Sequence, residues 1–289
     1  MKTKNILSTL IVLFIFITSA VAQGNLVTAD QLKGLKKEHK DNFVLIDASK
    51  TKLYTKAHID GAISIPYKAL NQKEGAVKGL IKTPEELAAF FGKMGVSDQD
   101  FIVIYDEGSQ KYSTRVFWVL KYLGAPNVKI LHKEMGAFRK ARVKLTSNVS
   151  SPKAKTFTAN VNKDIVVDLA YVKANLDNIV LIDVRTAKEF TGSDDVKKKY
   201  SEGHLPGAIH LDFKKFEKED KSFLSPEGFS SIAEKHGFTP EKTYVMYCKT
   251  GVKASVAYVF FTEVLGYKNV KVYEGAYLEW AAQGEAIEK

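Results

Sequence analysis

Cysteine is almost absent from this chain, since Cys248 is the only one in 289 residues. A disulfide within one chain needs two cysteines, so this fold cannot depend on a disulfide framework. Cys248 therefore carries a free thiol unless two chains join through it. A buried, inert thiol is the ordinary interpretation of a lone cysteine. The residues around Cys248 decide between that interpretation and a reactive one.

The chain also lacks a stripe of basic residues with interleaved aromatic side chains, although its formal net charge is +10. Its lysines are scattered among acidic residues, as at Lys214, Lys215 and Lys218, which is typical of solvated helix faces. Nucleic-acid binding is therefore not predicted. Small anions are the better partners for a basic site in such a protein.

Residues 1–22 differ from the rest of the chain. Lys2 and Lys4 precede an apolar run, and small residues in an A-x-A pattern end at Ala22. This pattern predicts a secretory signal peptide cleaved after Ala22, and hence a periplasmic or secreted protein with no membrane attachment after cleavage. An uncleaved membrane anchor is the alternative.

Cys248 lies in a basic loop between an apolar strand, residues 244–247, and an apolar helix, residues 254–265. Gly251 can adopt a positive φ, which would turn backbone N–H groups toward the sulfur. The helix N-terminus, Lys249 and Lys253 add positive charge and favour thiolate over thiol. The loop therefore predicts a site for a persistent sulfur anion rather than an inert cysteine.

Strand and helix patterns alternate along the first half of the chain. Strands are expected at residues 43–47, 62–65 and 101–105. A helix is expected to begin after the cap Thr83, with Pro84 at its first position, and another is expected over residues 114–123. The order strand, helix, strand predicts parallel pairing and an α/β fold.

The same plan repeats in the second half, at a constant offset of 142 residues that aligns Asp106 with Cys248. The chain is therefore expected to be an internal duplication, with domains at residues 23–145 and 164–289 joined by a linker at residues 146–163. Aspartate cannot carry sulfur, so the second domain is expected to do the chemistry, and the first to support or cover the site.

The second copy contains about ten extra residues around Asp194–Lys199. They predict a surface excursion that closes near the domain interface.

These motifs together resemble the rhodanese superfamily, specifically the tandem-domain thiosulfate and 3-mercaptopyruvate sulfurtransferases. The resemblance rests on Leu181-Ile182-Asp183-Val184-Arg185 with Glu189, on residues 203–209, on the Cys248 loop, and on Glu274-Gly275-Ala276 with Trp280. It implies two rhodanese-like domains in tandem, each a mainly parallel sheet flanked by helices. It also implies that a cysteine takes a sulfane sulfur from thiosulfate, becomes a persulfide and passes the sulfur to cyanide or a thiol. No metal or organic cofactor is implied.

Within the loop, the resemblance makes Cys248 the nucleophile and residues 249–253 (Lys249, Thr250, Gly251, Val252 and Lys253) the substrate-binding set. Lys249 favours thiosulfate, because mercaptopyruvate enzymes tend to have glycine there. Thr250 matches a serine often seen in mercaptopyruvate enzymes, although its hydroxyl could simply cap the helix. Lys253 departs from the threonine usual in the tandem family.

Outside the loop, Arg185 matches the anion-binding arginine of the family, and its planar fork suits a sulfonate or carboxylate. An internal ion pair with Asp183 or Glu189 is the alternative. His58 is a candidate for proton handling, with a structural role at a turn as the favoured alternative. Asp47 and Asp183 are expected to hold loops at strand ends.

Four other functions compete with thiosulfate sulfur transfer. The related phosphatases place an arginine six positions after the cysteine, where this chain has Ala254. A cysteine protease needs a dedicated histidine base and an orienting partner, and no such motif accompanies Cys248. A 3-mercaptopyruvate sulfurtransferase and a non-catalytic persulfide carrier both remain open alternatives.

Overall fold

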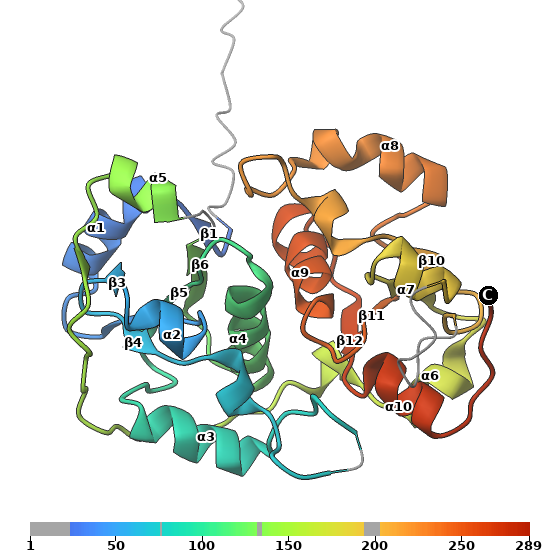
Figure 1. The fold of residues 1–289 in the computed structure, drawn as a ribbon, viewed down its shortest axis with the longest axis horizontal. Helices are drawn as coiled ribbons and strands as arrows, with labels where there is room; N and C mark the ends of the chain where they lie inside the picture. Colours follow the sequence, from blue (N-terminus) through green and yellow to red (C-terminus); the bar gives the residue numbers. More distant parts are fainter. Residues whose placement is uncertain (1–23, 76, 132–134, 194–202) are drawn as a thin grey trace, which may run out of the picture.

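The computed structural model describes residues 24–75, 77–131, 135–193 and 203–289. The predicted signal peptide and the predicted excursion at residues 194–199 lie outside them. Two α/β domains lie side by side, the first drawn in blue to green and the second in yellow to red (Figure 1). The predicted fold class is confirmed.

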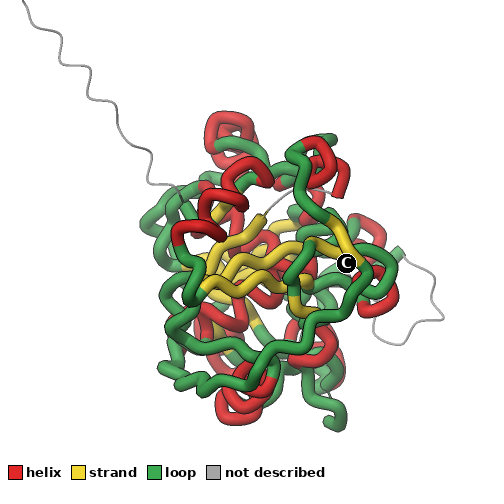
Figure 2. Tube along the Cα trace, turned by 90° about the vertical axis from the view of Figure 1, so that its left-hand side faces the viewer, coloured by secondary structure: helices red, strands yellow, loops and turns green. Residues whose placement is uncertain are grey.

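The first domain is built on five parallel strands in the order β1-β6-β5-β2-β4. The strands are β1 (Leu26–Val27), β2 (Phe43–Asp47), β4 (Ile63–Ser64), β5 (Phe101–Tyr105) and β6 (Val128–Leu131). The helices are α1 (Ala29–Glu38), α2 (Thr51–Tyr54), the 3₁₀ turn η1 (Tyr67–Leu70), α3 (Pro84–Lys93), α4 (Lys111–Tyr122) and α5 (Met135–Lys140). Figure 2 shows the strands in the middle, with helices on both sides of them.

The second domain repeats this arrangement with five parallel strands in the order β10-β9-β11-β12-β8. The strands are β8 (Val166–Val167), β9 (Val180–Asp183), β10 (Ile209–His210), β11 (Tyr244–Tyr247) and β12 (Val270–Tyr273). The helical segments are η2 (Lys163–Ile165), α6 (Leu169–Asn175), α7 (Ala187–Thr191), η3 (Phe213–Phe216), α8 (Pro226–His236), α9 (Ala254–Val259), the π-helical turn η4 (Phe260–Val264) and α10 (Ala276–Ala282). Read from β8, the order matches that of the first sheet, which agrees with the duplication expected from the sequence.

Local sequence signals set several boundaries. Thr83 caps α3 by accepting a hydrogen bond from the N–H of Glu86, whose carboxylate accepts from the N–H of Thr83. The predicted strands at residues 43–47 and 101–105 match β2 and β5. Helix α4 begins at Lys111, three residues before the predicted start, because the loop before it closes onto Asp106.

The parallel registers place the carboxyl ends of the central strands at one edge of each sheet. Tyr105 pairs with Asp47 in the first domain, and Tyr247 pairs with Asp183 in the second. The loops that begin at Asp106 and Cys248 therefore leave equivalent edges of the two sheets.

The two domains share a hydrophobic core. Helix α4 of the first domain packs against α9 of the second, and the buried cluster includes Val116 and Leu120 from α4 with Val256 and Phe260 from the other side (Figure 1). Because α4 and α9 directly follow the Asp106 and Cys248 loops, this contact brings both loops to the domain interface.

The segment after the first domain runs back along it. Strand β7 (Leu145–Thr146) pairs with β3 (His58–Ile59), and residues 147–162 contain no helix or strand. Lys155 and Asn160 donate their backbone N–H groups to the carbonyls of Gly92 and Leu123, and Phe157 is buried. Across the described ranges, no helix is both long and apolar enough to cross a membrane.

Candidate active site

Cys248 lies between the end of β11 and the start of α9, and only 2% of its surface is exposed. Its thiol is free. Gly251 has the expected positive φ, +77°. The carbonyls of Cys248 and Lys249 accept hydrogen bonds from the N–H groups of Tyr277 and Leu278 in α10. The loop is therefore fixed by its own sheet, by its following helix and by the first turn of α10.

The predicted substrate-binding residues of the loop differ in exposure. Lys249 and Thr250 are half-buried, whereas Gly251 and Val252 are buried. The Lys253 ammonium lies 3.3 Å from the Glu189 carboxylate, so part of its charge is already compensated. Burial acts to raise the pKa of Glu189, but hydrogen bonds from Thr186 and the charge of Lys253 outweigh it and hold that pKa below its usual value. Of the two lysines in the loop, Lys249 therefore has less of its positive charge compensated by neighbouring side chains than Lys253.

A loop of the first domain covers the Cys248 loop. Residues 71–75 and 77–81, here called the covering loop, are closed by a bridge between Asn71 and Ile81. A Cβ added at Gly79, whose φ is +102°, would lie 2.8 Å from the Cβ of Thr250. Only a glycine allows the two backbones to approach so closely. The first domain therefore contributes a wall to the site, as expected from the duplication.

Arg115 of α4 also reaches the Cys248 loop, and the sequence analysis did not select it. The side chain is fully buried. Its Nη2 donates to the two carboxylate oxygens of Glu274 at 2.9 and 3.1 Å and to the carbonyl of Gly79 at 3.3 Å. Its guanidinium carbon lies 4.8 Å from the centre of the Trp118 ring. The signal that could have revealed Arg115 is its position directly before the apolar run 116–120 of α4.

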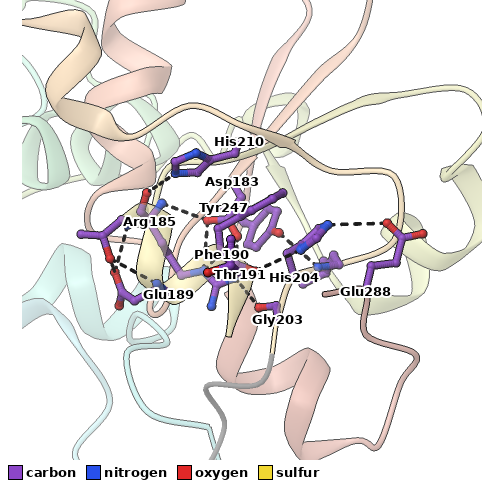
Figure 3. A network of polar contacts seen from close by, with 12 residues as sticks. Asp183, Arg185, Glu189, Phe190, Thr191, Gly203, His204, His210, Tyr247 and Glu288 are labelled. Carbon is purple, nitrogen blue, oxygen red and sulfur yellow. Dashed lines mark hydrogen bonds and ion pairs between the residues drawn. The ribbon is translucent and has the colours of Figure 1, made fainter. Parts of the chain in front are cut away.

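The anion-binding role expected for Arg185 needs correction. Its Nε and Nη2 donate to the Asp183 carboxylate, at distances down to 2.6 Å, and Nη2 also donates to the carbonyl of Gly203 (Figure 3). One face of the guanidinium lies 3.9 Å from the Tyr277 ring centre, and only 1% of the residue is exposed. Burial acts to lower the pKa of Arg185, but Asp183 outweighs it and raises that pKa. The alternative interpretation, an internal ion pair with Asp183, is the correct one.

The structure also contradicts a catalytic role for His58. Its Nδ1 lies 2.7 Å from the carbonyl of Tyr54 and its Nε2 lies 3.1 Å from the carbonyl of Asn148. The buried ring stacks on Tyr54 with 3.7 Å between ring centres. Strand β3, which contains His58, lies on the outer side of the first domain, away from β11 (Figure 1). His58 holds the segment after the domain to its turn.

His204 has the same structural role in the second domain. Its backbone exchanges two hydrogen bonds with Glu288 near the chain end, and its ring stacks on Phe190 (Figure 3). Asp47 and Asp183 also correspond, since each accepts a hydrogen bond from the N–H two residues later, at Ser49 and Arg185. The prediction that these aspartates hold loops at strand ends is confirmed.

The equivalent loop of the first domain is filled by its own carboxylate. Asp106 accepts hydrogen bonds from four backbone N–H groups and two hydroxyls. The donors belong to Gly108, Ser109, Gln110, Tyr112 and Ser113. This loop thus surrounds an anion, but the anion is part of the protein. Within the described ranges, no group of three or more His, Cys, Asp or Glu side chains is placed to hold a metal.

Comparison with known proteins agrees with this geometry. A family model described as the rhodanese-like domain matches residues 28–141 and 168–283. A putative thiosulfate sulfurtransferase of Synechococcus elongatus is 28% identical over 81% of this chain and 76% of its own length. A 3-mercaptopyruvate sulfurtransferase of Escherichia coli is 27% identical over 80% of this chain and 83% of its own length.

A solved structure shares the fold of the whole chain. SseA from Escherichia coli, described as a 3-mercaptopyruvate sulfotransferase, superposes with a TM-score of 0.78 at 24% identity, covering 88% of this chain and 98% of its own. The family match falls on both halves of the duplication and covers most of the chain. The chain therefore belongs to the rhodanese-like domain family, with one copy of the domain in each half.

Proposed function

We propose that this protein is a sulfurtransferase that carries a sulfane sulfur on Cys248, taking it from thiosulfate and passing it to cyanide or a thiol. The observation that carries the proposal is the position of the chain's only cysteine, in a buried basic loop between β11 and α9. The relatives named above as sulfurtransferases support the same reaction class.

The reaction divides into two balanced displacements. The Cys248 thiolate attacks the outer sulfur of thiosulfate, the sulfur–sulfur bond breaks, and sulfite leaves with the bonding electron pair. Cyanide then attacks the outer sulfur of the persulfide, and the Cys248 thiolate leaves as thiocyanate forms. Each step begins and ends with an anionic sulfur in the Cys248 loop: the thiolate charge is on Sγ, and the persulfide charge is on the outer sulfur bonded to it. A loop whose N–H groups stabilise the thiolate therefore also stabilises the persulfide. The covalent intermediate predicts ping-pong kinetics.

Lys249 supports thiosulfate as the preferred donor. Its side chain is half-buried beside Cys248, whereas the charge of Lys253 is partly compensated by Glu189. A sulfonate carries a full negative charge and benefits from a nearby cation. The second candidate is 3-mercaptopyruvate, which Thr250 favours because a hydroxyl next to Lys249 could bind a carboxylate or carbonyl oxygen.

The proposal also includes export to the periplasm or the outside of the cell. Its support is the basic, apolar and A-x-A pattern of residues 1–22. Mass determination of the protein recovered from its native host tests this: the mature chain should begin at Gln23, and a chain that still begins at Met1 would contradict cleavage.

Turnover with each donor tests the reaction and its specificity. Wild-type protein should release thiocyanate continuously from thiosulfate and cyanide, and Cys248→Ala should release none. Lys249→Gly should lower kcat/KM for thiosulfate roughly tenfold relative to that for 3-mercaptopyruvate, because it removes one cation that binds the sulfonate. An unchanged ratio would show that Lys249 does not select the donor. A single loading without turnover would identify a persulfide carrier instead of an enzyme.

A further inference from the structure

The strongest unexplained feature of the domain interface is the guanidinium of Arg115. Arg115 belongs to the first domain, but its charged group also contacts Glu274 and Gly251 of the second. Nη2 is hydrogen-bonded to Glu274 and to Gly79, as described above. Its Nε and Nη1 are buried and have no hydrogen-bond partner among the described residues. Leaving such donors unpaired inside a protein is costly, so their retention needs a reason.

The guanidinium lies directly on the Cys248 loop. A Cβ added at Gly251 would meet Arg115 Nη1 at 3.1 Å, and its Cζ and Nη2 at 3.5 Å. These three similar distances show that Gly251 faces the plane of the guanidinium. The Trp118 ring lies on the same group at 4.8 Å. Arg115 is therefore held between a ring of its own helix and the backbone of the loop that carries Cys248.

Glu274 connects Arg115 to the other side of the same loop. Its Oε1 also accepts the N–H of Ile81, at the end of the covering loop, at 2.8 Å. Helix α10, which starts two residues after Glu274, donates the N–H groups that hold the carbonyls of Cys248 and Lys249. Burial acts to raise the pKa of Glu274, and Arg115 opposes this effect. The opposite charges of Arg115 and Glu274 thus reach one loop from two domains.

We propose that Arg115 is a charge-positioning residue of the active site: the first domain supplies, through Arg115, a fixed positive charge that stabilises the anionic sulfur on Cys248, and Glu274 tunes that charge. The inference rests on the proposed function, because the anion stabilised is the thiolate and persulfide of the sulfur-transfer cycle. A buried charge acts strongly over a short distance because little water screens it. The first domain, which has no nucleophile of its own, therefore takes part in the chemistry as more than a cover.

Other charged residues lie near the loop: Lys78 precedes Gly79 in the covering loop of the first domain, and the rest belong to the second domain. Lys253 is paired with Glu189, and Arg185 with Asp183. Lys249 is half-buried, and Glu279 accepts a hydrogen bond from the Tyr273 hydroxyl near Glu274. None of these groups is removed when Arg115 or Glu274 is substituted, and Glu279 is the one whose charge acts directly on Glu274.

The pKa of the Cys248 thiol tests the proposal without any sulfur donor. Thiolate absorbance is titrated in the full-length chain, with Cys248→Ala as the blank that removes the tyrosine contribution. Arg115→Met should raise the thiol pKa by about one unit, and Glu274→Gln should lower it by about half a unit or more, because one variant removes a cation and the other its counter-charge. Arg115→Lys keeps the charge and should stay closer to wild type than Arg115→Met.

The opposite directions of the two expected changes in thiol pKa distinguish an electrostatic role of Arg115 from a structural one. Damage to the interface would move both variants in the same direction, and that result would overturn the proposal. A thiol pKa in folded Arg115→Met within about 0.2 unit of wild type would also overturn it. Lys155→Met is the matched control: it breaks another ion pair, between the linker and Asp100 of the first domain, and should leave the thiol pKa unchanged. If Arg115→Met does not fold, Glu274→Gln provides the test. A Cys248 thiol pKa that is unchanged or raised in that variant would overturn the proposal.

Sulfur loading gives a second readout. At a pH well below the thiol pKa, Arg115→Met should load sulfur from thiosulfate about tenfold more slowly, because a one-unit rise leaves a tenth of the thiolate. At a pH above both pKa values, the rates should converge. If the wild type turns over but its thiol pKa does not change when Arg115 is substituted, only the role of Arg115 is contradicted. If the thiol pKa changes when Arg115 is substituted but the wild type transfers no sulfur, the proposed function is contradicted.

Discussion

Two separate features of the structure require glycine at position 251. Its φ of +77° lies in the left-handed region, where a side chain is strained. The Arg115 guanidinium also occupies the space that a Cβ would need, with Nη1 at 3.1 Å. The sequence analysis gave the first reason for glycine here, but the second depends on a residue in the other domain.

Asp106 and Cys248 occupy equivalent positions in the two domains but carry different chemical groups. The loop of the first domain directs its donors onto a carboxylate that is part of its own chain, whereas the loop of the second carries a sulfur. An aspartate in the first copy was interpreted from the sequence as the loss of a nucleophile. The structure adds that the carboxylate satisfies the donors of the loop and thereby keeps its shape.

Removing that carboxylate should therefore destabilise the protein. Asp106→Ala leaves four buried N–H groups without their acceptor, and the free energy of unfolding should fall by about 2 to 4 kcal/mol. Urea denaturation measures this change. Asp106→Asn, which keeps one carbonyl acceptor, should fall between wild type and the alanine variant. A stability of Asp106→Ala equal to that of wild type would show that the donors find other partners.

The sequence selected Cys248 as the candidate nucleophile, assigned anion binding to Arg185 and did not select Arg115. Cys248 could be found because it is unique and lies in a basic strand-to-helix loop. Arg185 follows β9 in the way expected of an anion-binding arginine, but its side chain folds back onto Asp183, two residues earlier. Arg115 was missed because its role depends on the packing of α4 against the other domain, which no local pattern describes.

At the scale of elements, each domain sends one loop over the equivalent loop of the other. The covering loop of the first domain contacts Thr250, as the distance from Gly79 shows. In the second domain, residues 217–223 are closed by a bridge between Glu217 and Phe223, and the Lys221 carbonyl accepts a hydrogen bond from Gln110 beside Asp106. The two arrangements are equivalent, so the duplication extends to the interface itself.

Glu217 makes this second loop sensitive to pH. Its side chain is 5% exposed, and burial raises the pKa of Glu217 from 4.5 to about 7. Lys221, with its ammonium 4.0 Å away, opposes this, as do Lys111 and Lys214, while Asp106 adds to it. Because the folded-state pKa is above the unfolded one, the folded protein loses stability as pH rises from about 4.5 through about 7.

Glu217→Gln should remove this dependence. At pH 8 the variant should have a free energy of unfolding about 2 to 3 kcal/mol higher than wild type, whereas at pH 4.5 the two should be nearly equal. Urea denaturation at both pH values provides the comparison. Equal stability at pH 8, or a less stable variant there, would show that Glu217 is well solvated or paired when ionised.

Element boundaries were predicted best where local chemistry defines them. The helix start after Thr83 and the apolar strands β2, β5 and β11 matched their predictions. The helix expected over residues 254–265 is instead α9 followed by a π-helical turn, Phe260–Val264. Apolar periodicity identifies a helix but does not reveal such a turn, which here lies where Phe260 packs against Phe216 and Phe229.

At the scale of the whole molecule, the duplication and the fold class could be predicted because internal repeats and hydrophobic periodicity are visible in the sequence. The joint core of the two domains could not, since apolar positions on α4 and α9 predict burial without naming the partner surface. The interface matters for the proposed function, because the covering loop contacts Thr250 and Arg115 contacts Gly251, both in the loop that carries Cys248. The second domain therefore does not contain the whole active site.

The central claim is that Cys248 holds a transferable sulfur, and intact-protein mass measurement after incubation with thiosulfate tests it most directly. The account predicts that wild-type protein gains the mass of one sulfur atom, that the gain maps to Cys248 and disappears on addition of cyanide, and that Cys248→Ala gains nothing. A wild-type chain that gains no sulfur from thiosulfate or 3-mercaptopyruvate, or a Cys248→Ala variant that gains as much as wild type, would contradict it.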